Sequence, residues 1–254
     1  MILLLAGTQD GRELGSFLQK RGLPVILSTM TEYGSIIGGN FGLNTRSGPL
    51  SKDDLIKFVT DNMIRYIVDA THPYATLISK EAIKAAEKLE IGYIRYERPI
   101  EIISPSPLIN WVNSIEEAAR LASSLSGKVL VTTGSKELQM FVSSFNRALD
   151  QLLVRVLPTP DVLQKCFDIG LKPENIIAIQ GPFSKAFNLM LIKEKAIDIM
   201  VTKESGSIGG QVEKVEAALE AGIRLIILKR PAISYPALTE SFEEIYELIT
   251  KEAN

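Results

Sequence analysis

The sequence predicts an α/β fold built on parallel sheets. Apolar runs of four to six residues recur along the chain, and each is followed by a loop rich in Gly, Ser and Thr and then by a helical pattern. The runs are nearly continuous in Val, Ile and Leu, which is typical of parallel strands buried on both faces. Since helices alternate with these strands, the pattern indicates sheets covered on both sides by helices.

The expected elements follow from this alternation. Strands are expected at residues 2–5, 25–28, 66–69, 93–96, 129–132, 153–157, 176–179, 197–202 and 224–228. Helices are expected at residues 11–21, 51–62, 74–90, 115–125, 136–149, 211–221 and 240–251. Residues 40–47 alternate like a short exposed strand, and Ser51 is the expected cap of the helix that follows them. Asp53 and Asp54 suit the positive end of that helix.

The predicted domain boundary is the Ser-Pro-Ser-Pro motif at residues 104–107, which can continue neither a helix nor a central strand. It divides the chain into a first unit, residues 1–104, and a second unit, residues 105–254. Ligands of open parallel sheets bind at the carboxyl ends of the strands. We therefore expect two such units facing a central cleft that is lined by strand-end loops.

The composition narrows the class of function. The 254 residues have a formal net charge of −2, which argues against a general nucleic-acid-binding surface. No apolar run approaches the ~18 residues of a membrane span, and the apolar start lacks the basic flank of a signal peptide. One Cys and one His argue against a disulfide and against a metal site. We expect a cytoplasmic protein, and no pattern sets its oligomeric state.

The loop after the first strand has the composition of a phosphate-binding turn. Gly7 permits a tight turn, Gly11 lets a phosphate approach the start of the helix, Thr8 offers a hydroxyl and Arg12 a positive charge. The spacing is not that of the dinucleotide fingerprint, and the alternative is that the glycines only allow the helix to pack closely on the strand.

The end of the second strand bears on the choice of nucleotide. Ser28 and Thr29 stand where NAD-specific folds place an acid, which favours NADPH over NADH. NADH stays possible, because the neighbours Glu32 and Arg46 can reverse this inference.

The third strand ends at Asp69, and His72 follows it just ahead of a helix. A histidine there can bind a carboxylate, contact a nicotinamide or act as a general acid. The alternative is a histidine that caps the turn or bonds to Asp69, whose own expected role is to orient the loop.

The second half has three strand-end loops that carry a lysine and a serine within two residues of each other. For each loop alone, an ordinary capped turn explains the pattern. Because the lysines recur in matching places, we predict an anion-binding face. Its candidate residues are Ser135, Lys136, Ser184, Lys185, Lys203 and Ser205.

Taken in order, six motifs resemble those of the precorrin-6A reductases. They are Leu-Leu-Leu-Ala-Gly-Thr-Gln-Asp-Gly-Arg (3–12), Asp-Ala-Thr-His-Pro-Tyr-Ala (69–75), Arg-Tyr-Glu-Arg-Pro (95–99), Thr-Thr-Gly-Ser-Lys-Glu-Leu (132–138), Gln-Gly-Pro-Phe-Ser (180–184) and Val-Thr-Lys-Glu-Ser-Gly (201–206). Two departures stand out: Ala6 replaces the first glycine of the family's usual pair, and Ile100 replaces an aromatic residue.

The resemblance implies two Rossmann-like units and an oxidoreductase of cobalamin biosynthesis. Hydride from NADPH or NADH would reduce one double bond of precorrin-6A or of its cobalt-containing form. Gly7, Thr8 and Gly11 would hold the cofactor pyrophosphate with Arg12, Ser28 and Thr29, while the Lys/Ser set would bind the carboxylates of the macrocycle. His72, the tentative acid, and Asp69 would lie by the nicotinamide or the substrate.

Two alternatives stay open on the residues alone. The first is a nucleotide-sugar or phosphate transferase with a two-lobed cleft, and the second is a non-catalytic module that binds a nucleotide or a tetrapyrrole. Neither the glycine loops nor the charge pattern excludes them.

Overall fold

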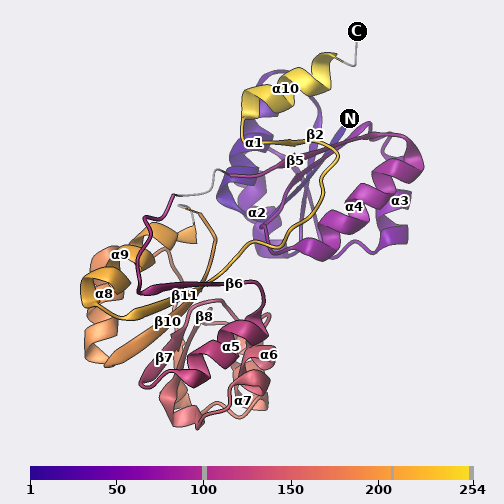
Figure 1. Cartoon of the computed structure of the whole chain (residues 1–254). Helices are drawn as coiled ribbons and strands as arrows, with labels where there is room; N and C mark the ends of the chain where they lie inside the picture. The colour runs from indigo at the N-terminus through magenta and orange to yellow at the C-terminus, as the bar shows by residue number, and fades with distance from the viewer. Residues whose placement is uncertain (99–101, 207–208, 252–254) are drawn as a thin grey trace. The chain divides into compact units, whose positions relative to one another are not determined.

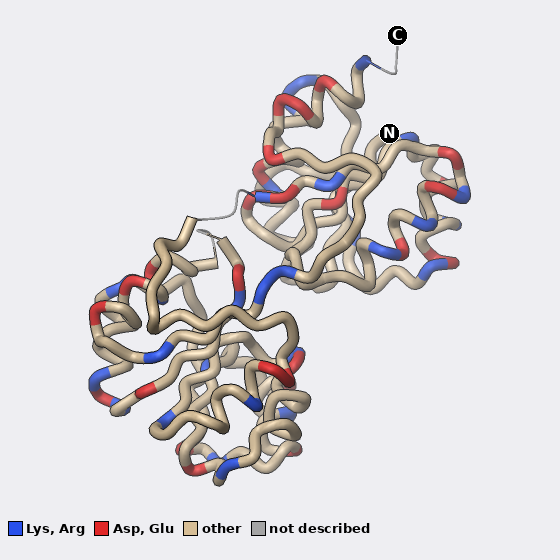
Figure 2. Tube along the Cα trace, in the orientation of Figure 1, with Lys and Arg blue, Asp and Glu red and all other residues tan. Residues whose placement is uncertain are grey.

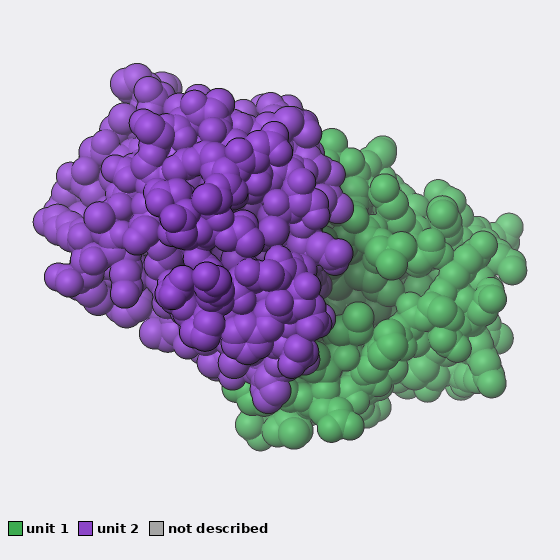
Figure 3. Space-filling model, turned by 90° about the horizontal axis from the view of Figure 1, so that it is seen from below, with its two compact units in different colours: residues 1–99, 231–254 green, residues 100–230 purple. Residues whose placement is uncertain are grey.

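The computed structural model describes residues 1–98, 102–206 and 209–251 of the chain. The chain forms two compact units, of which unit 1 comprises residues 1–99 and 231–254 and unit 2 comprises residues 100–230 (Figure 3). Each unit has its own sheet and its own covering helices (Figure 1). Every strand pairing among the described residues is parallel, which confirms the predicted α/β class.

Unit 1 is built on a six-stranded sheet. Its strands are β1 (Ile2–Ala6), β2 (Val25–Thr29), β3 (Asn44–Ser47), β4 (Tyr66–Ala70), β5 (Gly92–Tyr96) and β12 (Leu238–Thr239). Their order across the sheet is β12-β5-β4-β1-β2-β3. When the six strands are numbered in chain order and read across the sheet from the β3 edge, this is the 3-2-1-4-5-6 order of dinucleotide-binding sheets. The ligand crevice of such sheets lies where the strand order reverses, which here is between β1 and β4.

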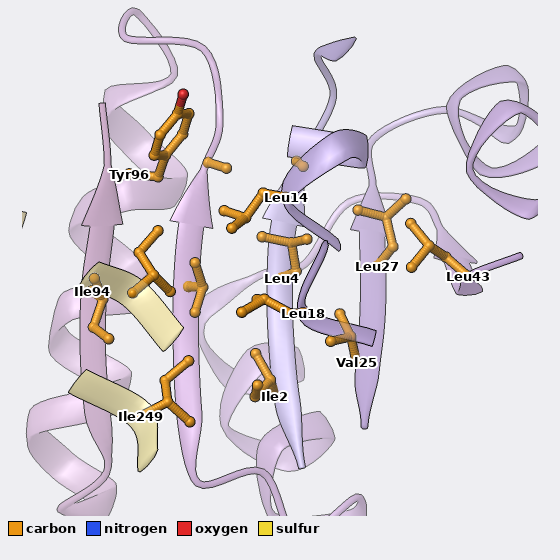
Figure 4. Packing of buried hydrophobic residues seen from close by; sticks show 14 residues of the cluster. Ile2, Leu4, Leu14, Leu18, Val25, Leu27, Leu43, Ile94, Tyr96 and Ile249 are labelled. Carbon is orange, nitrogen blue, oxygen red and sulfur yellow. The ribbon is translucent and has the colours of Figure 1, made fainter. Parts of the chain in front are cut away.

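Two layers of helix cover this sheet. The helices are α1 (Gln9–Lys20), α2 (Glu32–Asn40), α3 (Lys52–Asp61), α4 (Thr76–Leu89) and α10 (Phe242–Lys251). Alternate side chains of β1 serve the two faces. Leu4 packs with Leu14 and Leu18 of α1 and with Ile249 of α10 (Figure 4), whereas Leu3 belongs to the core under α3 and α4. A strand buried on both faces reads as a continuous apolar run, which is why β1 is predictable.

The last segment of the chain belongs to unit 1, which differs from the expected division at residues 104 and 105. Leu238 pairs with Arg95 and Thr239 with Tyr96, so β12 extends the first sheet. Ile245 and Ile249 of α10 are buried in the core that Leu4 shares. The apolar face of α10 can be buried only on the β5 side of that sheet, so residues 231–254 are not part of the second unit.

Unit 2 holds the second six-stranded sheet. Its strands are β6 (Ile109–Val112), β7 (Lys128–Val131), β8 (Leu152–Val156), β9 (Ile176–Ala178), β10 (Ile197–Lys203) and β11 (Arg224–Leu228). Its helices are α5 (Ile115–Ser124), α6 (Leu138–Ser144), α7 (Pro160–Asp168), α8 (Lys185–Glu194) and α9 (Gln211–Ala221). The strand order is β6-β11-β10-β7-β8-β9. From β7 the chain adds β8 and β9 toward one edge of the sheet, and from β10 it adds β11 toward the other edge. The connections therefore diverge between β7 and β10, and ligands of open α/β sheets bind at such a point.

Charges of both signs are interspersed over both units (Figure 2). In the described ranges, no helix is long and apolar enough to cross a membrane.

Candidate functional site

The loop between β1 and α1 has the features of a phosphate-binding turn. Thr8 is the N-cap residue of α1, and its side chain makes no capping bond to the helix. Its hydroxyl lies 3.5 Å from the carbonyl oxygen of Ala70 on β4. No described atom lies within 4 Å of the position that a Cβ on Gly7 would take. A ligand can therefore approach the backbone at Gly7 and meet the first N–H groups of the helix.

Gly11 is explained by packing. A Cβ at this position would lie 2.4 Å from Cβ of Ala6 and 3.4 Å from the carbonyl oxygen of Ala70. Gly11 thus lets α1 settle directly on β1 and β4, which is the alternative that the sequence left open. Its contribution to a ligand is reduced to its backbone N–H in the first turn.

No pattern in the sequence indicates that Asp10 has a buried partner. Its carboxylate and a guanidinium nitrogen of Arg98 lie 3.1 Å apart, and both side chains are buried. The pair joins the first turn of α1 to the segment after β5. Because Arg98 neutralises Asp10, the start of α1 keeps the positive character that an anionic ligand needs.

Arg12 lies on the side of α1 toward α2. Its guanidinium carbon is 6.0 Å from the centre of the Phe41 ring. The side chain is half-buried, and its Nε makes no hydrogen bond within the described part of the chain.

Ser28, Thr29 and Arg46 meet at the carboxyl ends of β2 and β3. Arg46 Nη1 donates to Ser28 Oγ at 3.0 Å, and its Nη2 donates to the carbonyl oxygen of Ser47 at 2.7 Å. Thr29 Oγ1 donates to the carbonyl oxygen of Thr31 at 2.9 Å, so this hydroxyl shapes the turn into α2. Partial burial lowers the pKa of Arg46, and the nearby Asp54 opposes that shift.

Asp69 is the centre of a buried polar network at the end of β4. Its Oδ1 accepts bonds from Arg95 Nη1 at 2.9 Å and from the Thr71 hydroxyl at 2.6 Å, while its Oδ2 accepts from the Tyr93 hydroxyl at 2.8 Å. Burial, followed by the charge of Asp69, raises the pKa of Tyr93. Among the described residues, none of the bonds to this carboxylate comes from His72. Asp69 therefore holds the loop and β5 together.

His72 is half-buried in the same loop, at the edge where β1 and β4 end. Its Nδ1 accepts a bond from the backbone N–H of Tyr74 at 3.3 Å, and the two rings are 5.6 Å apart. An imidazole that accepts at Nδ1 carries its proton on Nε2 when neutral. The structure thus places His72 at the strand edge that the sequence predicts, with its tautomer set by the turn.

The lysines of unit 2 do not form one free basic face. Lys185 pairs with Glu216 at 3.7 Å and with Glu220 at 2.9 Å on the outside of α8 and α9. Lys203 pairs with Glu137, which joins the end of β10 to the loop after β7. Lys136 is exposed and precedes Glu137, the N-cap residue of α6, so it lies outside the first turn of that helix.

The serines beside them have local roles. Ser184 caps α8 by accepting from the backbone N–H of Phe187, which is the alternative of an ordinary capped turn that the sequence left open. Ser135 lies before Glu137, the N-cap residue of α6, and so does not cap that helix. Ser205 is buried and donates to the carbonyl oxygen of Gly209 at 3.3 Å.

A pocket of about 380 Å³ opens at the carboxyl ends of the unit 2 strands. Two of the strand-end loops expected from the sequence line it, at Gly134 and at Phe183, although the predicted Ser and Lys side chains of those loops are not part of its lining. Its polar lining includes Arg155 of β8 and Lys214 of α9, both of which are buried. Arg155 alternates with valines inside an apolar strand, and Lys214 lies three residues into a helix. Only the sheet order, which sequence does not specify, brings the two together.

Fold and site together define a class of α/β protein with two units, in which the first sheet has the strand order of dinucleotide-binding folds. The family model described as "Precorrin-6x reductase CbiJ/CobK" matches residues 1–250. A cobalt-precorrin-6A reductase of Priestia megaterium is 40% identical over 99% of each chain, and one of Methanocaldococcus jannaschii is 39% identical over 100% of this chain and 98% of its own. A precorrin-6A reductase of Rhodococcus erythropolis is 30% identical over 96% of this chain and 94% of its own.

The solved structure of the CobK precorrin-6A reductase has the same fold. It superposes with a TM-score of 0.79 at 22% identity and covers 98% of this chain and 96% of that one. The chain belongs to the precorrin-6A reductase family, and it is therefore an oxidoreductase of cobalamin biosynthesis that uses a nicotinamide cofactor.

Proposed function

We propose that the protein uses NADPH to reduce one double bond of cobalt-precorrin-6A. The observation that carries this proposal is the family match over nearly the whole chain, in which the relatives at 35–40% identity are named for the cobalt-containing macrocycle. Two relatives named for the cobalt-free macrocycle are 29–30% identical, and a further relative named for the cobalt-containing one is 28% identical. In the reaction, a hydride from the reduced nicotinamide and a proton add across the double bond, and the oxidised nucleotide is released.

Unit 1 is the proposed cofactor-binding unit. The pyrophosphate would lie against the N–H groups that follow Gly7, with the Thr8 hydroxyl and the Arg12 guanidinium beside it. Support comes from the open space at Gly7, the uncommitted cap of Thr8 and the neutralisation of Asp10 by Arg98. Gly11 contributes its backbone and the close packing that holds α1 in place.

Arg46 is the proposed reason for a preference for NADPH over NADH. The ribose of a bound dinucleotide lies at the end of the second strand, where NADP-binding folds carry an arginine. Arg46 lies at the end of β3, next to the end of β2, and bonds to Ser28, so its guanidinium would be within reach of a 2′-phosphate on that ribose. At the end of β2 the chain has Ser28 and Thr29 in place of the acidic residue that binds the ribose hydroxyls in NAD-specific folds.

His72 is the proposed proton donor. It lies at the edge where β1 and β4 end, next to the proposed pyrophosphate turn, and its Nδ1 is bonded to the Tyr74 N–H. This bond directs the proton to Nε2, the atom from which a neutral imidazole can donate. Asp69 acts as a positioning residue through the loop backbone, since its side chain bonds to the N–H of Thr71 at 3.0 Å.

The carboxylates of the macrocycle are assigned to unit 2. Of the predicted residues, Lys136 is exposed and Ser135 directly precedes it. Lys185 forms ion pairs with two glutamates of α9, which indicates a structural role for this lysine. Lys203 is the last residue of β10, and Ser205 follows it in the loop, at the point where the strand connections diverge.

We assign the reaction to the cytoplasm, where the single cysteine stays reduced.

The test compares binding of NADPH and of NADH by wild type and by Arg46→Met. Loss of a charge-assisted bond to a phosphate costs about 1.5–3 kcal/mol, which weakens NADPH binding about 10- to 150-fold. The Kd for NADH should stay within about twofold. Arg65→Met removes an exposed arginine at the opposite end of the sheet and serves as the matched control. Equal weakening of both nucleotides would contradict the role assigned to Arg46.

A further inference from the structure

The unit 2 pocket lies at the carboxyl ends of β7 and β8, next to the point between β7 and β10 where the strand connections of the sheet diverge. It is lined by the ends of β7 and β8, by the loop before α8 and by the first turns of α9. Val156, Leu157, Pro182 and Phe183 form its apolar walls. The volume of about 380 Å³ exceeds that of a small inorganic anion many times over, since a water molecule takes about 30 Å³.

Two buried cations share this pocket. The exposed fraction of Arg155 is 8% and that of Lys214 is 7%. Arg155 Nη1 donates to Asn188 Oδ1 at 2.8 Å, and the guanidinium carbon lies 4.3 Å from the centre of the Phe183 ring. Lys214 Nζ donates to the carbonyl oxygen of Gly209 at 3.1 Å. All of these partners are neutral.

No carboxylate within the described residues forms an ion pair with either cation. Glu213 is the acid whose charge acts on Lys214, and it does so from a distance. Burying two unpaired cations side by side is costly, and proteins keep such charges where a ligand supplies the counter-charge. Burial lowers the pKa of Lys214 to about 8, with Arg155 as the next cause, and burial lowers the pKa of Arg155 to about 10.

The start of α9 adds to the positive potential. Gly209 and Gly210 line the pocket, and Gly210 is the N-cap residue of α9 without a side-chain cap. The backbone N–H of Gln211 donates to the carbonyl oxygen of Gly206 at 3.3 Å, whereas no side-chain cap within the described residues is provided for the N–H groups of Val212 and Glu213 in the first turn of this 11-residue helix.

We propose that this pocket binds one carboxylate side chain of the macrocycle, with Arg155 and Lys214 as its ligands. The proposal rests on the proposed function and specifies its substrate contacts. Arg155 offers the planar fork that suits a carboxylate, and Lys214 adds a point charge. The apolar walls suit the hydrocarbon edge of a macrocycle better than a phosphate, which has no apolar part.

The test measures KM, kcat and NADPH affinity for Arg155→Met and Lys214→Met with cobalt-precorrin-6A as substrate. KM for the macrocycle should rise about tenfold or more for each variant, while Kd for NADPH stays within about twofold. Lys165→Met removes an exposed lysine of α7 in the same unit and should leave all three quantities unchanged. Arg155→Lys keeps a charge but loses the fork, so its KM should fall between those of wild type and Arg155→Met.

Thermal unfolding separates a binding role from a structural one. Lys214→Met removes a buried, unpaired charge and should raise the Tm while it raises KM. If Lys214 had only a structural role, its replacement by Met would lower the Tm of the protein. Since Trp111 lies on β6, its fluorescence reports whether unit 2 of each variant is folded.

Three results would overturn the proposal. An unchanged KM in folded Lys214→Met would do so, and so would weaker binding of NADPH with an unchanged KM for the macrocycle, which would assign the pocket to a phosphate of the cofactor. Wild-type protein that reduces neither form of the macrocycle would instead refute the proposed function, and this inference with it.

Discussion

Replacement of Asp69 by Asn tests the buried network that holds the His72 loop to β5. Asp69 is fully buried, and the exposed fraction of its partner Arg95 is 1%. The substitution keeps the size of the side chain but removes the charge that balances Arg95. The guanidinium then stays buried with its bond at 2.9 Å weakened, and the Tyr93 hydroxyl loses a charged acceptor.

The expected cost follows from this geometry. Breaking a buried ion pair by removing one partner costs about 3–5 kcal/mol. The cost should lie toward the lower end of this range, because Glu97 Oε1, 3.6 Å from Arg95 Nη2, still balances part of the charge. Removal of both charges in Asp69→Asn/Arg95→Met should restore part of the loss, since no unpaired cation remains. Asp61→Asn is the matched control, because Asp61 is exposed at the end of α3 and its replacement should change stability by less than about 0.5 kcal/mol.

Urea unfolding followed by far-ultraviolet circular dichroism measures these differences. Fluorescence of Trp111, the single tryptophan, reports on unit 2 and distinguishes a local loss from a global one. A loss below about 1 kcal/mol in Asp69→Asn would refute the assignment of Asp69 as the main counter-charge of Arg95.

Three further predictions concern packing, proton transfer and pH. Gly11→Ala should destabilise the protein by about 1–3 kcal/mol, because its Cβ would lie 2.4 Å from that of Ala6, whereas Gly39→Ala, with open space around it, should stabilise by about 0.5–1 kcal/mol in the same thermal melts. His72→Ala should reduce kcat about 100-fold or more with an unchanged Kd for NADPH, and unchanged turnover would rule out the acid role. KM for the macrocycle should rise as the pH passes about 8, because Lys214, under the influence of Arg155 and Glu213, loses its proton there. A pH profile that is the same in Lys214→Met would contradict this assignment.

Strands with a uniform environment were predictable from sequence. The β1 run is buried on both faces, and its apolar pattern follows directly from that. Other elements lack such a signal. Helix α2 contains three glycines, and the helix therefore shows no periodic apolar stripe. At one of them, Gly38, a Cβ would lie 2.5 Å from Cδ2 of Leu27, so the close packing of the helix requires a glycine there. Strand β12 is two residues long and depends on pairing with β5.

The positions of the candidate residues at the strand ends were predictable from the sequence, whereas the bonding partners of their neighbours were not. Residues at strand ends, such as His72 and Ser28, follow from the rule that ligands bind there. Arg95 and Arg98 look like solvated charges or a basic rim in sequence, yet both are buried in ion pairs with Asp69 and Asp10. The partners lie 26 and 88 residues away along the chain, and only the tertiary fold brings them together.

Two motif positions that were compared with the family lie outside the described residues. These are Pro99 and Ile100, which follow Arg98. The same holds for residues 207–208 in the glycine-rich loop before α9.

The measurement that tests the central claim most directly is the oxidation of NADPH and of NADH by the purified protein with cobalt-containing and with cobalt-free precorrin-6A. Loss of the absorbance of the reduced nicotinamide is followed together with the mass of the macrocycle. The account predicts consumption of one NADPH per cobalt-precorrin-6A, a gain of two hydrogens in the product and a lower kcat/KM with NADH. Absence of nucleotide oxidation with either macrocycle would contradict it.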